Sequence, residues 1–379
     1  MSEHEVPGAS EGEARRWFER LLQEAYSAGA ADVHLVPEAT PRLRIDGRLE
    51  PRGDPVPADR LEALARELFG EAGLARQRQE GFATRSLRLD LRGRIEGPGT
   101  RGDAPLSRPA GSGGLFGRAT LASTCGRFSI SFRMGVGLGA GTLPLEALRL
   151  PSVVLDELLA HDHGLILVAG SHESGKTTTL LALTRWIVDH QPVHVCTVED
   201  PLVQLLAPGV ALLQQREVGT DVPDVRTGIA AALGQDLDVL VVNEVPDLES
   251  LMGLLHAAET GHLVLAQVHA RSPGEALERL IEAAPEGLET SVRRSLAETL
   301  RGVIWQRLLP RQPRGRVAAH EVLVADEALR ATLLGGGRLA DPRGAPSSVS
   351  LGSQLEALER EGLIAPEVAA EARREARGR

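Results

Sequence analysis

The 379-residue sequence contains a single lysine, Lys176, among its 42 basic residues; all the others are arginine. Arginine has replaced lysine wherever a positive charge alone is enough. The remaining ammonium is therefore expected where a planar guanidinium cannot substitute for it. Lys176 lies in a stretch with the spacing of a phosphate-binding loop, so the scarcity of lysine marks this position as functional.

Other scarcities exclude whole classes of protein. Only two cysteines, Cys125 and Cys196, occur, which excludes a four-cysteine zinc site and fits a reducing compartment. No apolar stretch approaches the roughly 20 residues that a membrane-spanning helix needs, and the N-terminus has no signal-like apolar segment. A cytoplasmic location is the expectation that follows from these absences.

Nucleic acid is not an expected partner. The net charge is −10, whereas a nucleic-acid-binding protein needs a basic surface that displaces counterions. Ten aromatic residues also offer few platforms for base stacking. An ATP-driven nucleic-acid translocase is therefore the least favoured function considered below.

The first third of the chain predicts a small α+β domain over residues 11–134. An amphipathic helix is expected over Glu11–Gly29, a second over Ala58–Phe69, and short alternating strands around them. Residues 93–117 are rich in Gly, Pro, Ser and Arg and poor in large apolar side chains, so they are interpreted as a mobile loop. Residues 135–142 form a glycine-rich hinge in this interpretation.

Residues 143–325 predict an α/β domain with a parallel sheet. Nearly continuous apolar runs at 165–169, 193–198, 239–242 and 263–268 alternate with helical patterns, as in strands that are buried on both faces. Residues 326–379 carry short, charged helical patterns and are interpreted as a helical appendage. The predicted fold class is thus α/β with an additional N-terminal α+β domain.

A phosphate-binding loop follows the first of these strands. Gly170 to Thr177 matches G-x-x-x-x-G-K-[ST], with a strand before it and a helix expected over Thr177–Asp189. Backbone N–H groups and the helix N-terminus would hold the phosphates of ATP, Lys176 would bridge the outer phosphates, and Thr177 would ligate Mg²⁺. The predicted nucleotide-binding residues of the loop are Gly170, Ser171, Ser174, Gly175, Lys176, Thr177 and Thr178.

Three further residues end apolar strands at the edge where open α/β sheets bind ligands. Glu244 follows Val239–Val242 and is the candidate that orients or deprotonates the attacking water. Glu199 ends the preceding strand and is a candidate for supporting Mg²⁺. His269 ends the strand 263–268 and is the candidate sensor of the terminal phosphate.

The order of motifs resembles the type II/IV secretion ATPase superfamily, and within it the PilT/PilU-like retraction motors of type IV pili. The motifs concerned are Thr197–Pro201, Gln215–Val218, Val242–Glu249 and Ala257–Val264 after the phosphate-binding loop, with Gly29–Leu35 and Arg42–Gly47 before it. They resemble an aspartate box, a QREV motif, Walker B, a histidine box and the family's N-terminal domain.

The resemblance implies a PAS-like N-terminal domain and a RecA-like P-loop domain. It also implies a hexamer, pilus-related twitching motility, and a partner at the inner-membrane platform of the machine, on its cytoplasmic side. Arginines of the N-terminal domain reach the phosphates in this family, and the matching positions here are Arg118, Arg127 and Arg133. Domain closure about residues 135–142 on ATP binding is the motion that the resemblance predicts.

The sequence also departs from the family pattern. Glu173 stands where glycine is usual in the phosphate-binding loop, Val203 replaces an acid, and Asn243 replaces a glycine. Arginines that are usual near Walker B are replaced by Ala230, Gly234 and Pro246. Two functions remain open: a divergent ATP-hydrolysing motor, or a nucleotide-binding accessory subunit with weak or no hydrolysis that works beside an active paralogous ATPase.

Overall fold

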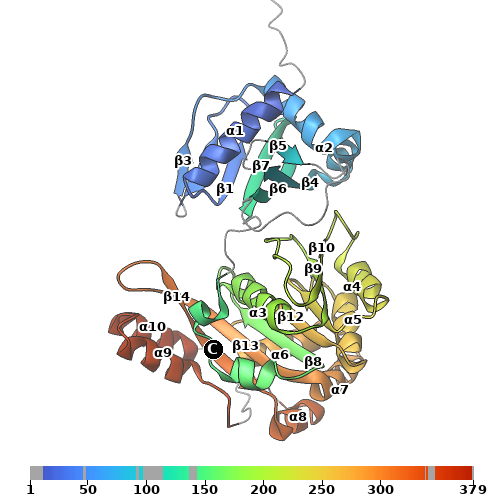
Figure 1. Ribbon diagram of the computed structural model, residues 1–379, viewed down its shortest axis with the longest axis vertical. Coiled ribbons are helices and arrows are strands. Elements are labelled where there is room, and N and C mark those ends of the chain that lie inside the picture. The colour runs from blue at the N-terminus through green and yellow to red at the C-terminus, as the bar shows by residue number, and fades with distance from the viewer. Residues whose placement is uncertain are drawn as a thin grey trace, which may run out of the picture. The chain divides into compact units, whose positions relative to one another are not determined.

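The computed structural model describes residues 12–45, 48–90, 94–96, 114–135, 143–337, 339 and 346–377. The chain divides into two compact units, one formed by Met1–Gly141 with Val203–Ala207 and the other by Thr142–Leu202 and Pro208–Arg379. Each unit has its own sheet and its own hydrophobic core (Figure 1). Apart from Gly135, the predicted hinge lies outside the described residues.

The first unit is a seven-stranded antiparallel sheet with two helices. The strands lie in the order β3-β2-β1-β7-β6-β4-β5. Phe18 and Leu22 of the first helix are fully buried, and the Phe18 ring meets Phe132 edge-on at 5.9 Å between centroids. The elements are α1 (Glu13–Ser27), β1 (Asp32–Leu35), β2 (Arg42–Ile45), β3 (Arg48–Pro51), α2 (Ala58–Glu80), β4 (Phe82–Asp90), β5 (Arg94–Glu96), β6 (Gly114–Thr124) and β7 (Arg127–Gly135).

The second unit contains a seven-stranded sheet in the order β10-β9-β11-β12-β8-β13-β14. All neighbouring strands are parallel except β13 and β14. After the single turns η1 (Leu145–Leu148) and η2 (Val154–Leu158), its strands are β8 (Gly164–Gly170), β9 (His194–Glu199), β10 (Leu212–Glu217), β11 (Val239–Val242), β12 (Leu263–His269), β13 (Leu300–Pro310) and β14 (Arg316–Val324). Its helices are α3 (Lys176–His190), α4 (Val225–Leu233), α5 (Leu248–Glu259), α6 (Pro273–Glu282), α7 (Glu289–Thr299), α8 (Glu327–Leu334), α9 (Leu351–Arg360) and α10 (Pro366–Arg377).

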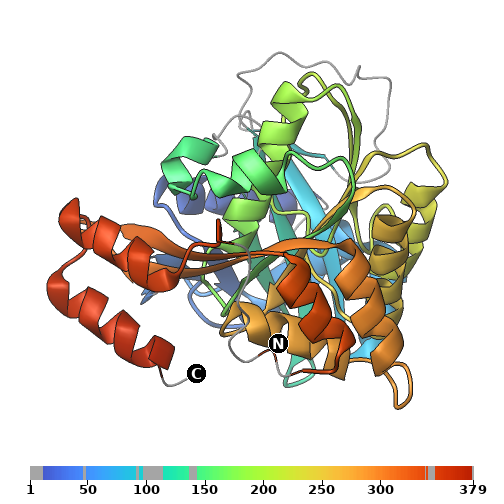
Figure 2. The same cartoon turned by 90° about the horizontal axis from the view of Figure 1, so that it is seen from below.

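Both faces of this sheet are covered, as the apolar strands predict. Along β8, Leu165 and Leu167 belong to the core beneath α4 to α7, whereas Ile166 and Val168 belong to the core beneath α3. The C-terminal helices pack through Leu355 and Leu358 of α9, which are buried in the first of these cores. Figures 1 and 2 show α9 and α10 side by side next to the β13–β14 pair.

Several element boundaries differ from the sequence predictions. The helical span α2 runs past Phe69 to Glu80, but Gly70 has non-helical angles (φ 63°, ψ −179°), so two helical segments meet at a kink directly after the predicted end at Phe69. β13 begins directly after α7 without any turn residue, so its start carries no sequence signal. Within the predicted loop 93–117, residues 94–96 and 114–117 lie in strands that pair with β4, and the remainder lies outside the described residues.

Among the residues described, no helix is both long enough and apolar enough to span a bilayer.

Candidate nucleotide-binding site

The predicted phosphate-binding loop connects β8 to α3 at the carboxyl edge of the parallel sheet. Two glycines are required by its shape. A Cβ atom on Gly170 would lie 2.4 Å from Ser174 Oγ and 2.6 Å from the carbonyl oxygen of Gln306. Gly175 has φ 87°, in the left-handed region, and precedes the first residue of α3. The chain therefore forms the tight loop at a helix N-terminus that suits an anion.

Lys176 and Ser174 are buried in this loop, with only 4% and 3% of their surfaces exposed. Lys176 Nζ donates a hydrogen bond to the carbonyl oxygen of Ser171 at 2.6 Å. Burial lowers the pKa of Lys176 to about 8, although Glu244 acts in the opposite direction. The buried ammonium and the buried Ser174 Oγ, which has no hydrogen-bond partner among the residues that the structure describes, are donors suited to the phosphates of a nucleotide, so the residues present fit ATP.

Thr177 is tied to β12 rather than to an acid. Its hydroxyl donates to Gln267 Oε1 at 3.1 Å, which joins the first turn of α3 to the sheet. Gln267 was not predicted from the sequence. It lies two residues before His269 on one strand, so the two side chains share a face, and this spacing is the signal that could have identified it.

Glu244, Gln267 and His269 line one cavity of about 250 Å³ at the ends of β11 and β12. Because these strands are parallel neighbours with Val242 opposite Ala266, residues beyond their ends meet at one edge. Arg279 of α6 also lines the cavity and donates to the carbonyl oxygen of His269. The structure thus brings together the predicted water-orienting acid and the predicted phosphate sensor.

His269 also faces the phosphate-binding loop. Its ring lies 6.2 Å from that of His172, centroid to centroid. Burial lowers the pKa of His269 first, and the positive charge of Lys176 and the nearby His172 and Arg279 lower it further. Without a nucleotide the surroundings of His269 therefore favour its neutral form, whose one ring N–H can donate to a phosphate.

Glu199 ends β9 and is 3% exposed. Its carboxylate accepts hydrogen bonds from Thr197 Oγ1 at 2.7 Å and from Gln215 Nε2 at 3.2 Å, so it is held by its own strand and by β10. Glu217 of β10, also buried, is its partner in the β-ladder. The role of Glu199 toward Mg²⁺ stays a prediction.

One departure from the family pattern has a structural explanation, and a second has a structural cost. Asn243 accepts from the backbone N–H of Asp200 at 2.8 Å and donates to the carbonyl oxygen of Pro201 at 2.9 Å. It therefore joins the end of β11 to the segment after β9, which a glycine would not do. Glu173 is exposed and has φ 57°, a conformation in which glycine is the unstrained residue.

The three arginines predicted to reach the phosphates lie in the first unit. Arg118 donates to Thr84 Oγ1 at 3.0 Å, Arg127 pairs with Glu38 at 3.4 Å, and Arg133 pairs with Asp32 at 3.0 Å. Arg118 and Arg133 are opposite each other in the β6–β7 ladder, so their side chains leave the same face. Their role toward nucleotide stays a prediction.

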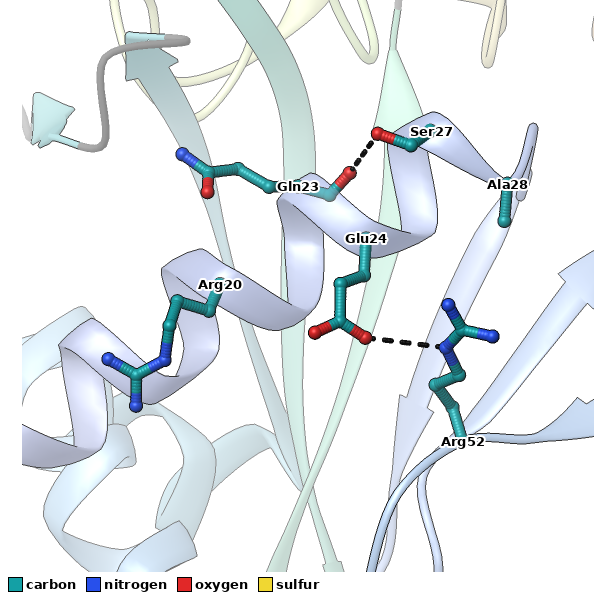
Figure 3. Close-up of a pocket in the computed structure, with 6 residues that line it drawn as sticks. All are labelled: Arg20, Gln23, Glu24, Ser27, Ala28 and Arg52. Atoms are coloured by element: carbon teal, nitrogen blue, oxygen red, sulfur yellow. Dashed lines mark hydrogen bonds and ion pairs between the residues drawn. The ribbon is translucent and has the colours of Figure 1, made fainter.

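A second hollow, of about 490 Å³, lies in the first unit and contains none of the predicted site residues. Figure 3 shows it between the exposed side of α1 and the chain after β3, with Glu24 paired to Arg52 at 3.3 Å. It is open and lined by surface side chains. Although this hollow is larger, the smaller cavity lined by Glu244 and His269 is therefore the better candidate for the binding site.

Comparisons with known proteins identify the family of this chain. The family model described as "Type II/IV secretion system protein" matches residues 146–343. An uncharacterized protein of Escherichia coli, YggR, is 33% identical over 312 residues, covering 81% of this chain and 86% of YggR. The type IV pilus retraction ATPase PilT of Pseudomonas aeruginosa is 29% identical over 365 residues, covering 93% and 96%.

A solved structure, the pilus retraction motor PilT with bound ADP, superposes with a TM-score of 0.76 at 30% identity. It covers 93% of this chain and 96% of that one. This likeness confirms the predicted fold class, an N-terminal domain followed by a RecA-like domain with C-terminal helices. The chain therefore belongs to the type II/IV secretion system protein family and resembles its PilT-like P-loop ATPases.

Proposed function

We propose that the protein is an ATP-hydrolysing motor of the pilus retraction type. The observation that supports this best is that Lys176, Glu244 and His269 lie at one edge of the sheet. Glu244 follows β11, His269 ends β12, and Lys176 begins the helix after β8, and these three strands are neighbours. All three residues are retained in this sequence, although other positions of the family pattern are substituted. ATP, whose terminal phosphoanhydride is the bond to be broken, is the substrate.

Each residue has a distinct task in this proposal. The backbone of Gly170–Gly175 and the Lys176 ammonium would bind the phosphates, and Thr177 and Glu199 would hold Mg²⁺. Glu244 orients the attacking water and accepts its proton, which a carboxylate at the mouth of the cavity can do. His269 donates a hydrogen bond from its ring N–H to an oxygen of the terminal phosphate group while that group is being transferred to water.

The assembly we propose is a hexamer at the cytoplasmic face of an inner-membrane pilus or secretion platform. Residues 11–134 act as the PAS-like domain, 143–325 as the ATPase domain, and 326–379 as the appendage. Arg118, Arg127 and Arg133 reach toward the phosphates from the first of these domains. Support comes from the retraction ATPases to which the chain is similar along nearly its whole length.

Steady-state ATP hydrolysis with Mg²⁺ tests the proposal. Lys176→Ala should abolish binding and turnover, whereas Glu244→Gln should abolish turnover and leave binding intact. Glu298→Gln is the matched control, because Glu298 is exposed on α7 and pairs with Arg294. Turnover by the native protein that survives Glu244→Gln would contradict the role given to Glu244.

A second function, a nucleotide-binding accessory subunit, is favoured by one group of observations. Glu173 places an extra negative charge in the phosphate-binding loop, and Ala230 and Gly234, both exposed at the end of α4, replace arginines. ADP binding by the native protein without any turnover would select this function. The search would then turn to an active paralogous ATPase as partner.

A further inference from the structure

A buried glutamine, Gln306, lies directly beneath the phosphate-binding loop and has no part in the mechanism above. It belongs to β13, the strand beside β8, and only 1% of its surface is exposed. Its Nε2 donates a hydrogen bond to the carbonyl oxygen of Ser174 at 2.8 Å. A buried amide is costly unless it is hydrogen-bonded, and this bond to Ser174 satisfies the Gln306 donor.

Gln306 contacts both glycines that shape the loop. Its backbone carbonyl oxygen would lie 2.6 Å from a Cβ atom on Gly170, and its side-chain Nε2 would lie 3.1 Å from a Cβ atom on Gly175. The residue therefore packs against the loop at its first and last glycine. A Cβ atom on Gly170 would collide with this backbone oxygen and with Ser174, whereas a Cβ atom on Gly175 would be in tight contact with the Gln306 amide.

The hydrogen bond to Ser174 fixes the direction of a backbone donor. The peptide bond between Ser174 and Gly175 is planar and trans, so the Ser174 carbonyl and the Gly175 N–H point in opposite directions. Holding the carbonyl against β13 therefore aims the Gly175 N–H away from the sheet, into the concave side of the loop. In a loop of this type, that N–H is one of the donors to phosphate.

His320 of β14 lies behind Gln306. The two residues are opposite each other in the antiparallel β13–β14 ladder, so their side chains leave the same face of the sheet. Within the described residues, His320 is fully buried and neither ring nitrogen has a hydrogen-bond partner, and Gln306 Oε1 also lacks one. A neutral imidazole carries one N–H donor, and Gln306 Oε1 is an acceptor without a donor.

We propose that Gln306, which lies opposite His320 in the β13–β14 ladder, is a positioning residue that fixes the Ser174–Gly175 peptide for phosphate binding. The inference rests on the proposed nucleotide-binding function of the loop. It assigns no chemistry to either residue, because neither touches the reacting atoms. The Gly175 N–H serves the phosphates of ADP and ATP alike. Loss of the hydrogen bond that orients it should therefore weaken ground-state binding and leave the chemical step unchanged.

The test replaces Gln306 by methionine, which keeps the length of the side chain and removes the donor. The dissociation constant of ADP and the KM for ATP should each rise about tenfold, as for the loss of one hydrogen bond to a charged group, with kcat within about twofold of native. Gln77→Met is the matched control. Gln77 is 5% exposed in α2 of the other unit and donates to Ser123 Oγ at 2.7 Å, so its removal should leave both constants unchanged.

His320→Phe provides a second, independent variant that leaves Gln306 in place. It should weaken ADP binding in the same direction, and the double variant should weaken it by less than the product of the two single effects, because both act on one peptide. A native ADP affinity in Gln306→Met and His320→Phe, or a loss confined to kcat, would overturn the inference. Failure of the native protein to bind ADP would instead contradict the proposed function.

Discussion

The buried imidazole of His320 should make the ATPase unit sensitive to acid. Burial lowers the pKa of His320 from its ordinary 6.5 to about 4. Between these pH values the folded protein keeps the ring neutral, whereas the unfolded chain binds a proton. Unfolding therefore takes up a proton, and the free energy of unfolding falls as the pH is lowered through this interval.

The magnitude follows from the shift. Each unit of pKa corresponds to ~1.4 kcal/mol, so lowering the pH from 7 to 4 should cost about 3 kcal/mol through this one side chain. That is a large part of the 5–15 kcal/mol, roughly, by which a domain is usually stable. The contribution is fully present above pH 6.5 and lost progressively below it.

Urea unfolding at a series of pH values measures this effect. Trp186 and Trp305 report on the ATPase unit by fluorescence, since both lie in its elements. His320→Phe fills the same apolar space without a titrating ring, so its free energy of unfolding should depend less on pH, by about 3 kcal/mol between pH 7 and 4. The control His256→Gln removes an exposed histidine of α5 and should keep the native slope. Equal slopes for native protein and His320→Phe would refute the reasoning.

Three further outcomes are expected at the site. ADP affinity should decrease as the pH rises through about 8, because Lys176 loses its charge there, and a titration of the dissociation constant between pH 7 and 9.5 checks this. Glu173→Gly should strengthen ATP binding several-fold and relieve ~1 kcal/mol of backbone strain, as calorimetry and thermal unfolding would show; weaker binding would contradict the charge argument. Asn243→Ala should lower the free energy of unfolding by ~1 kcal/mol, because two partly buried backbone groups lose their partner, and an unchanged urea midpoint would exclude that role.

Much of the fold could be predicted because the parallel sheet is buried on both faces. The strands β8, β9, β11 and β12 are nearly continuous apolar runs, and their ends place Glu199, Glu244 and His269 at one edge. β13 was not recognised, since nothing separates it from α7. Its polar residue Gln306 is explained only by a contact with Ser174, 132 positions away in sequence.

The site shows the same division between local and distant information. The phosphate-binding loop carries its own pattern, so its residues could be named from the sequence. Gln267 and Asn243 act through hydrogen bonds to Thr177 and Asp200, which lie on other strands or helices. Such pairings depend on which strands are neighbours, and that order is a property of the folded sheet.

The single lysine also makes the protein unusually simple to label. Acylating reagents attack unprotonated amines, and here those amines are only the chain N-terminus and Lys176, which burial keeps easier to deprotonate than an ordinary lysine. A reagent small enough to enter the loop would therefore report on nucleotide occupancy by mass alone. For the same reason, acetylation of this one side chain would remove the only lysine charge of the sequence, and with that charge the contribution of Lys176 to phosphate binding.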